Sequence, residues 1–143
     1  METGAGESRR GTRMGIAAGV LGGGMLVLSS VAHAFLGWPP LEAALSAEGV
    51  DQEVLVGLSV GWFFGSVAML TLGVLVLWMV RLAAVGDLGN PLGAWMVALA
   101  YAGFGIVAFV LRGLDPQFLV FIVNGILVAG FAVLAIPRAS RTT

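Results

Sequence analysis

Four long apolar segments without a charged residue constrain this chain more than any other feature of its sequence. They run from Met14 to Leu36, from Val54 to Val80, from Leu92 to Leu111 and from Phe118 to Ile136. A helix needs about 20 apolar residues to cross the hydrocarbon core of a bilayer. Because that core holds no water to bond the backbone, a spanning segment is either a helix or a strand of a closed barrel. Barrel strands are about 10 residues long and alternate apolar with polar residues, so these segments are predicted to be helices.

The composition agrees with an integral membrane protein and excludes other classes. Of the 143 residues, 59% are hydrophobic and 10% are charged, whereas a soluble domain carries about 25% charged residues. A soluble monomer of this size has too much surface to hide so much apolar area, and a disordered chain is polar and rich in charge. There is no cysteine for a disulfide, a thiolate metal site or thiol redox chemistry. The net charge of −1 gives no reason to expect a nucleic-acid partner.

We therefore predict an all-α integral membrane four-helix bundle with both termini in the cytoplasm. The expected helices cover about 14–36, 53–81, 91–112 and 116–137, with cytoplasmic tails at 1–13 and 138–143. With four crossings, six of the seven arginines lie on one side of the membrane and only Arg112 on the other. Positively charged residues stay in the cytoplasm, which sets the orientation. The use of arginine without lysine, with much alanine, glycine and valine, suggests a GC-rich bacterial genome. For a bacterial chain with four spans we expect a multi-pass location in the cell inner membrane.

The first connection between spans contains two adjacent prolines. Pro39 and Pro40 are expected to end the first helix at the membrane surface. Beyond them, residues 40–48 have their apolar side chains on one helical face. We expect either a short helix lying flat on the outer surface or an irregular loop there.

The later connections carry local signals for helix ends. Asn90 and Asp115 each precede a proline, a pair that offers an N-cap and a first-turn proline to the following helix. Gly113 suits a left-handed residue that closes the third helix. The last connection is therefore predicted to be a tight turn, with the last two helices as antiparallel neighbours.

The amino-terminal segment has a second interpretation. Residues 1–34 combine a basic start, an apolar stretch and the small-x-small pattern of Ala32, His33 and Ala34. These are the features of a cleaved secretory signal. Cleavage would leave three spans with the same final orientation, and N-terminal sequencing of the purified protein distinguishes the two cases.

Small residues recur at a spacing of four in the spans, where they allow helices to approach closely. The glycines concerned are Gly15, Gly19 and Gly23 in the first span, Gly57, Gly61 and Gly65 in the second, and Gly125 in the fourth. They are expected to pack inside the bundle, which needs such faces in any case, or to form a seam between copies of the chain. A leucine at Gly19 or Gly61 is predicted to lower stability, because it adds a side chain where no volume is free.

Polar residues at membrane depth are costly and often mark function. The candidates for one polar pocket open to the outside are Ser29, His33, Ser59, Trp62, Tyr101 and Asn124. His33 lies 18 residues after Gly15, about five helical turns, so it faces the bundle as Gly15 does. The alternative role is structural. Serines bond the backbone of their own helix, Asn124 links helices, and the indole of Trp62 finds an acceptor.

The sequence offers little for catalysis. No carboxylate lies within a span, there is a single histidine, and no phosphate-binding loop is found, so no cofactor and no metal are expected. We predict a small non-enzymatic membrane protein embedded in the lipid bilayer, either an accessory subunit of a larger membrane complex or a small homo-oligomer. An oligomeric channel or transporter for a small neutral solute is the alternative. A membrane enzyme or a cofactor carrier that uses His33 with a methionine is the third hypothesis.

Overall fold

The structure is a computed structural model that describes residues 3–135, and these residues are helical apart from short connections. Four of the helical segments are long and apolar enough to cross a membrane. Within the described part of the chain there is no strand. The prediction of an all-helical chain with four candidate spans is confirmed. The predicted tail 138–143, with its two arginines, lies outside the described residues.

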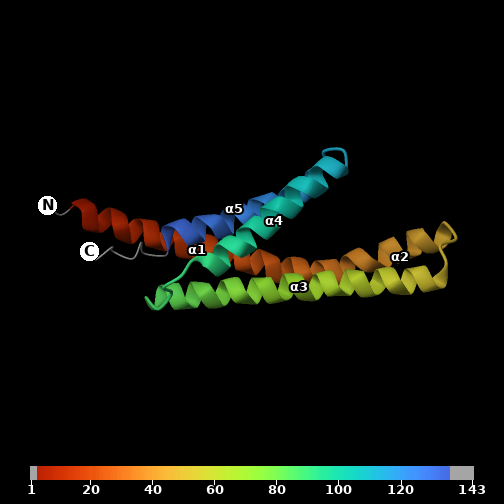
Figure 1. Cartoon of the computed structure of the whole chain (residues 1–143), viewed down its shortest axis with the longest axis horizontal. Helices are drawn as coiled ribbons and strands as arrows, with labels where there is room; N and C mark the ends of the chain where they lie inside the picture. The colour runs from red at the N-terminus through yellow and green to blue at the C-terminus, as the bar shows by residue number, and fades with distance from the viewer. Residues whose placement is uncertain (1–2, 136–143) are drawn as a thin grey trace.

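The first helical rod is longer than predicted at both ends. Helix α1 covers Thr3–Ala32, a π-helical turn η1 follows at His33–Gly37, and α2 covers Trp38–Ala47. The predicted break at Pro39 and Pro40 is wrong, because α2 runs on along the line of α1 instead of turning away as a surface helix or a loop (Figure 1). Both prolines fall in the first turn after the wide turn η1. A proline is tolerated in the first turn of a helix, so the rod continues through both residues.

Helix α3 is the longest single element and runs antiparallel to this rod. It covers Gln52–Ala84, and its 33 residues span about 50 Å at 1.5 Å per residue. That length exceeds a hydrocarbon core of about 30 Å, as its long apolar run predicted. The backbone N–H of Glu53 donates to Asp51 Oδ1 over 2.8 Å at its start. After α3, the N–H of Leu92 donates to Asn90 Oδ1 over 2.8 Å, but the N-cap of the next helix is Pro91 rather than Asn90 as predicted.

The last two helices form the predicted antiparallel hairpin. Helix α4 covers Leu92–Leu111, a 3₁₀ turn η2 covers Pro116–Phe118, and α5 covers Leu119–Leu134. Gly113 has a φ of +68°, as expected for a left-handed cap. The side chain of Asp115 accepts the backbone N–H of Gln117 over 3.0 Å at the start of η2.

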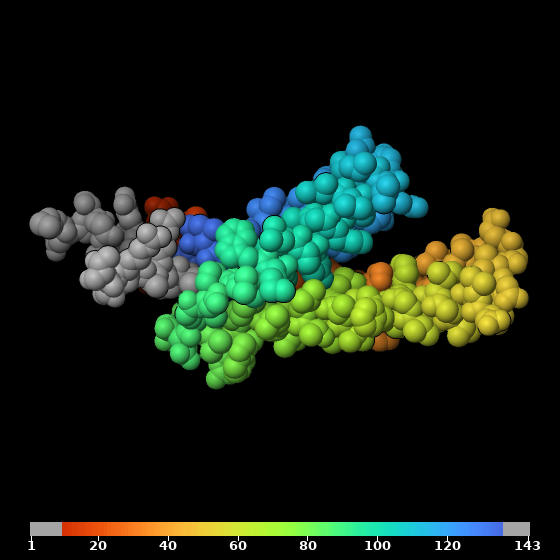
Figure 2. All heavy atoms as spheres, in the orientation of Figure 1, coloured from red at the N-terminus to blue at the C-terminus, as the bar shows by residue number. Residues whose placement is uncertain are grey.

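The helices are arranged as a fork rather than as four parallel rods. Helix α1 packs along both α3 and α5, and α4 packs along α5, whereas α3 and α4 touch only briefly. All four meet near the end of α5, beyond which the first turns of α1 project alone, and we call this the closed end (Figure 1). Toward the other end, the open end, the α4–α5 arm leans away from the arm made of η1, α2 and α3. Figure 2 shows open space between the two arms.

The closed half of the fork holds the core. Its largest fully buried side chains are Leu26 of α1, Val76 of α3, Val97 of α4, and Val128 and Phe131 of α5. Each helix therefore contributes to one shared apolar contact. The many exposed apolar side chains elsewhere are those expected to face lipid.

Charged side chains separate between the two ends of the fork. Arg10, Arg13 and Arg81 lie at the closed end, while Arg112 lies at the tip of the α4–α5 arm. The other tip, between α2 and α3, carries only acidic charges: Glu42, Glu48, Asp51 and Glu53. Among the described residues, the arginines are thus grouped as the four-crossing prediction requires.

Candidate functional site

The glycine row of α1 brings this helix into close contact with α3 and α5. A Cβ atom added at Gly19 would collide with Val80 and lie 2.9 Å from the ring of Phe131. A Cβ at Gly15 would meet the backbone of α5, and one at Gly23 would lie 2.9 Å from an α3 side chain. Only glycine fits these three positions, so they position α1 between its two neighbours.

Other glycines hold the remaining helix pairs together. A Cβ at Gly125 of α5 would lie 2.8 Å from Ala102 of α4, as the small-residue argument expected. Gly73 of α3 was missed by the sequence analysis, although a Cβ there would lie 2.9 Å from Leu26 of α1. Gly73 stands eight residues after Gly65, which places it about 80° further round the helix, on the side that faces α1.

The first part of the α3 row behaves differently. A Cβ at Gly57 or Gly61 would have no atom within 4 Å, and one at Gly65 would meet only Nε2 of His33 at 3.6 Å. The prediction that this row packs inside the bundle is therefore wrong for Gly57 and Gly61. No described residue covers these two positions.

The direction of the open row follows from helical geometry. Gly61 lies 18 residues before Met79, about five turns, so both point to the same side of α3. Met79 faces α4, because its sulfur lies 3.1 Å from the Cβ position of Gly93. Gly61 therefore points to the same side of α3 as α4. At the closed end α4 covers that side, but at the level of Gly61 it has diverged from α3.

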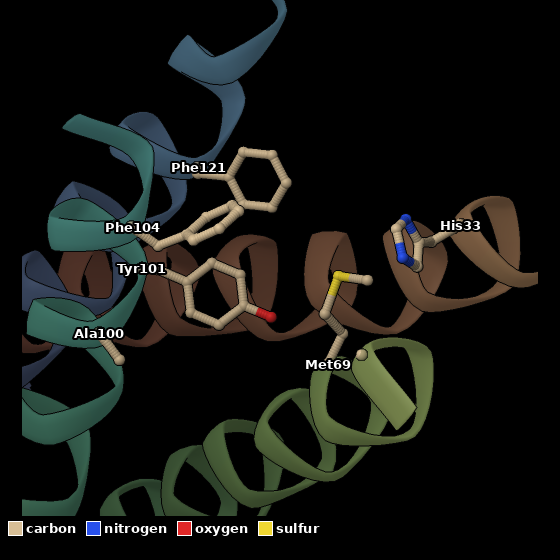
Figure 3. Close-up of a pocket in the computed structure, with 7 residues that line it drawn as sticks. His33, Met69, Ala100, Tyr101, Phe104 and Phe121 are labelled. Atoms are coloured by element: carbon tan, nitrogen blue, oxygen red, sulfur yellow. The ribbon is translucent and has the colours of Figure 1, made fainter. Parts of the chain in front are cut away.

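A cavity of about 230 Å³ lies at the base of the fork, where the two arms separate (Figure 3). It is lined by His33 of η1, Gly65 and Met69 of α3, Ala100, Tyr101 and Phe104 of α4, and Phe121 of α5. Two members of the predicted polar pocket, His33 and Tyr101, thus share this cavity. The other four, Ser29, Ser59, Trp62 and Asn124, do not line it.

Tyr101 supplies a buried polar atom that lacks a partner. Its side chain is only 7% exposed, and its hydroxyl makes no hydrogen bond within the described residues. In Figure 3 this hydroxyl points away from α4 toward the side chain of Met69, with His33 beyond it. A buried hydroxyl without a partner costs about 1–3 kcal/mol, so this position favours a hydrogen-bonding guest.

His33 is fixed by Trp62 of α3. The imidazole and the indole are stacked, with centroids 4.0 Å apart and planes within 9°. The indole N–H of Trp62 donates to the backbone carbonyl oxygen of His33 over 2.7 Å. This bond is the partner that the sequence analysis required for Trp62, and it orients His33 at the edge of the cavity.

The predicted polar residues outside the cavity do not form a common site. The hydroxyl of Ser59 donates to the carbonyl oxygen of Val56 in its own helix over 2.7 Å, and Ser29 is half-buried on α1. Asn124 is only 3% exposed, and its Oδ1 has no hydrogen-bond partner among the described residues. This oxygen faces α1, because a Cβ at Gly22 would lie 3.4 Å from it. Its predicted role as a hydrogen-bonded link between helices is not seen for this atom.

Most of the cavity wall was not foreseen. Met69, Phe104 and Phe121 are apolar residues in apolar spans, and nothing in the sequence separates them from residues that face lipid. Met69 lines the cavity together with His33, so a methionine does lie near this histidine. Within the described residues, no group of three or more histidine, aspartate or glutamate side chains is placed to hold a metal ion.

No known family model, curated protein or solved structure matches this chain. The functional argument therefore rests on the fork, the open glycine row and the cavity.

Proposed function

We propose that this chain is a non-enzymatic integral membrane protein that binds a transmembrane helix of a partner, as an accessory subunit of a larger membrane complex. The observation that carries the proposal is the open face of α3, where Gly57 and Gly61 point away from every described neighbour. In an apolar helix, glycines spaced four apart form a shallow groove against which a second helix packs. The partner's helix would lie in the fork, against this groove.

The rest of the molecule supports a helix rather than lipid as the occupant. Where glycines stand on α1 and α5, as at Gly19 and Gly125, a neighbouring helix fills the space that a side chain would take. Lipid chains gain little from a glycine groove, whereas a helix backbone gains close van der Waals contact there. A partner's helix in the fork would pack against Gly57 and Gly61 as α3 and α5 pack against Gly19.

The separation of charges supports a membrane orientation for this binding. We propose that the closed end, with Arg10, Arg13 and Arg81, lies on the cytoplasmic side of a bacterial inner membrane. The fork then opens toward the outside, where the acidic tip between α2 and α3 lies. A reporter active only outside the cytoplasm should function when placed at 48–51 and fail when placed at 85–90. The reverse result contradicts this orientation.

Site-specific cross-linking tests the proposed helix partner. Because the chain has no cysteine, Gly61→Cys labelled with a photoreactive maleimide gives one attachment point in native membranes. The matched control is Gly103→Cys on α4, where a Cβ also has no atom within 4 Å. We expect one defined adduct from Gly61→Cys and none from Gly103→Cys. An adduct of twice the 14.7 kDa chain would make the partner a second copy and the protein a homo-oligomer. No adduct, or the same adducts from both variants, contradicts the proposal.

We do not favour the alternative of a solute channel. Its motivation was a band of polar side chains at membrane depth, but most of their hydroxyls already have acceptors. Backbone carbonyl oxygens accept the hydroxyls of Ser30, Ser59, Ser66 and Thr71. Such bonds are typical of hydroxyl side chains that serve packing.

A further inference from the structure

We infer that the cavity at the base of the fork binds a small, uncharged, single-ring carbonyl compound dissolved in the membrane, of the quinone class. This site is separate from the proposed helix groove, since it lies at the level of Gly65 and Met69 rather than of Gly57 and Gly61. The inference rests on the cavity's size, its aromatic wall and its two polar groups.

The size of the cavity sets the size of the guest. An apolar cavity of about 150 Å³ accommodates a benzene molecule. The 230 Å³ between the arms therefore holds one six-membered ring with small substituents. An alkyl tail on that ring has a path out, because the cavity is open on one side rather than enclosed.

The wall of the cavity favours a flat ring. Phe104 and Phe121 meet edge to face, with centroids 4.9 Å apart, and Tyr101 lies 6.1 Å from Phe121. Aromatic side chains pack well against the faces and edges of another ring, and the thioether of Met69 makes favourable contacts with aromatic groups. No lysine, arginine, aspartate or glutamate lines the cavity, so a charged guest would find no counter-charge.

The two polar groups explain why the guest should carry oxygen. The unpaired hydroxyl of Tyr101 donates to a carbonyl oxygen, which relieves the cost of its burial. The imidazole of His33, held by Trp62, offers a second polar group on the far side of Met69 (Figure 3). A quinone carries oxygens at opposite ends of one ring, which suits two polar groups placed apart.

Binding to the purified full-length protein tests the inference. The probe is 2-decyl-1,4-benzoquinone, and the control compound is decylbenzene, which has the same ring and tail without oxygens. We expect the quinone to raise the unfolding temperature and to quench tryptophan fluorescence with saturation, and decylbenzene to do neither. Tyr101→Phe keeps the ring and removes the hydroxyl, so it should weaken binding about fivefold, which corresponds to the roughly 1 kcal/mol of one hydrogen bond.

A second variant keeps the test independent of Tyr101. Gly65→Leu has room for its Cβ, with the nearest atom at 3.6 Å, and its longer side chain fills the cavity. It should abolish quinone binding while the unliganded protein unfolds at the wild-type temperature, and Gly103→Leu should bind as wild type does. Equal binding of decylbenzene and the quinone, or wild-type binding by Gly65→Leu, overturns the inference. These results do not depend on whether Gly61→Cys finds a helix partner.

Discussion

The glycine rows of α1 and α3 have the same spacing in the sequence and opposite surroundings in the structure. Gly15, Gly19 and Gly23 leave no room for a Cβ, whereas Gly57 and Gly61 face open space. The spacing shows only that a helix can be approached closely. Whether another helix of the same chain packs there depends on which helix faces the glycines. The divergence of the two arms leaves Gly57 and Gly61 without one.

The position of each helix explains the difference. Helix α1 lies between α3 and α5, so small residues on either of its sides meet a neighbour. Helix α3 has α1 along its length but α4 only near the closed end. Gly73 faces α1 and is buried, whereas Gly61 faces the side from which α4 has diverged and is open.

The largest effect should come from filling the closed row. Gly19→Leu forces a side chain against Val80 and Phe131, and such overpacking costs about 1–3 kcal/mol. We expect a clear fall in the unfolding temperature of the monomer in detergent, followed by circular dichroism. Val74→Leu is the control, since Val74 is 54% exposed on α3. Unchanged unfolding of Gly19→Leu would mean that α1 does not pack between α3 and α5 as described.

The next effect concerns how the open half of α3 is anchored to the first rod. Trp62→Phe removes the hydrogen bond to the carbonyl oxygen of His33 and reduces the stacking area, which together should cost about 1 kcal/mol. Thermal unfolding of the purified monomer measures this loss. Trp95→Phe on α4, outside this contact, should unfold as the wild type does. If both variants lower the unfolding temperature equally, Trp62 does not anchor α3 to the first rod.

A smaller effect is expected at the hydrogen bond between α1 and α3. Ser30 of α1 donates to the carbonyl oxygen of Ser66 of α3 over 2.8 Å, and both serines are buried. Bonds of this kind in membrane proteins contribute about 0.6 kcal/mol on average, so Ser30→Ala should lower the unfolding temperature slightly. The neighbouring Ser29→Ala is the matched control and should not. A larger loss from Ser29→Ala would show that the wrong serine has been placed at this contact.

Much of the fold follows from the sequence, because the physics concerned is local or general. Apolar length predicts the four helices, and the cap at Asp115 and the turn at Gly113 are read directly from residue type. The continuation through Pro39 was not predicted, since it depends on the wide turn η1 that places the proline in a first turn. A π-helical turn has no simple residue signature.

The candidate site was harder to foresee for a different reason. His33 and Tyr101 stand out as polar residues at membrane depth, and both line the cavity. Met69 and Phe121 come from different helices and look like any residue that faces lipid. Their meeting depends on the angle between the arms, which is a property of the whole fork and not of any one segment.

The smallest effect on the monomer, and the sharpest test of the comparison, is expected at Gly61. A Cβ there meets no atom within 4 Å, so Gly61→Leu should leave the unfolding temperature of the monomer at the wild-type value, in contrast to Gly19→Leu. Gly103→Leu, equally open on α4, is the reference for a leucine that meets nothing. In native membranes the two open positions should differ. The leucine at Gly61 occupies the groove and prevents partner binding, so gentle extraction should yield only free protein, while Gly103→Leu keeps its partner. If Gly61→Leu instead melts the monomer as early as Gly19→Leu does, then α4 covers α3 at this level, the arms are closed, and the two glycine rows are equivalent after all.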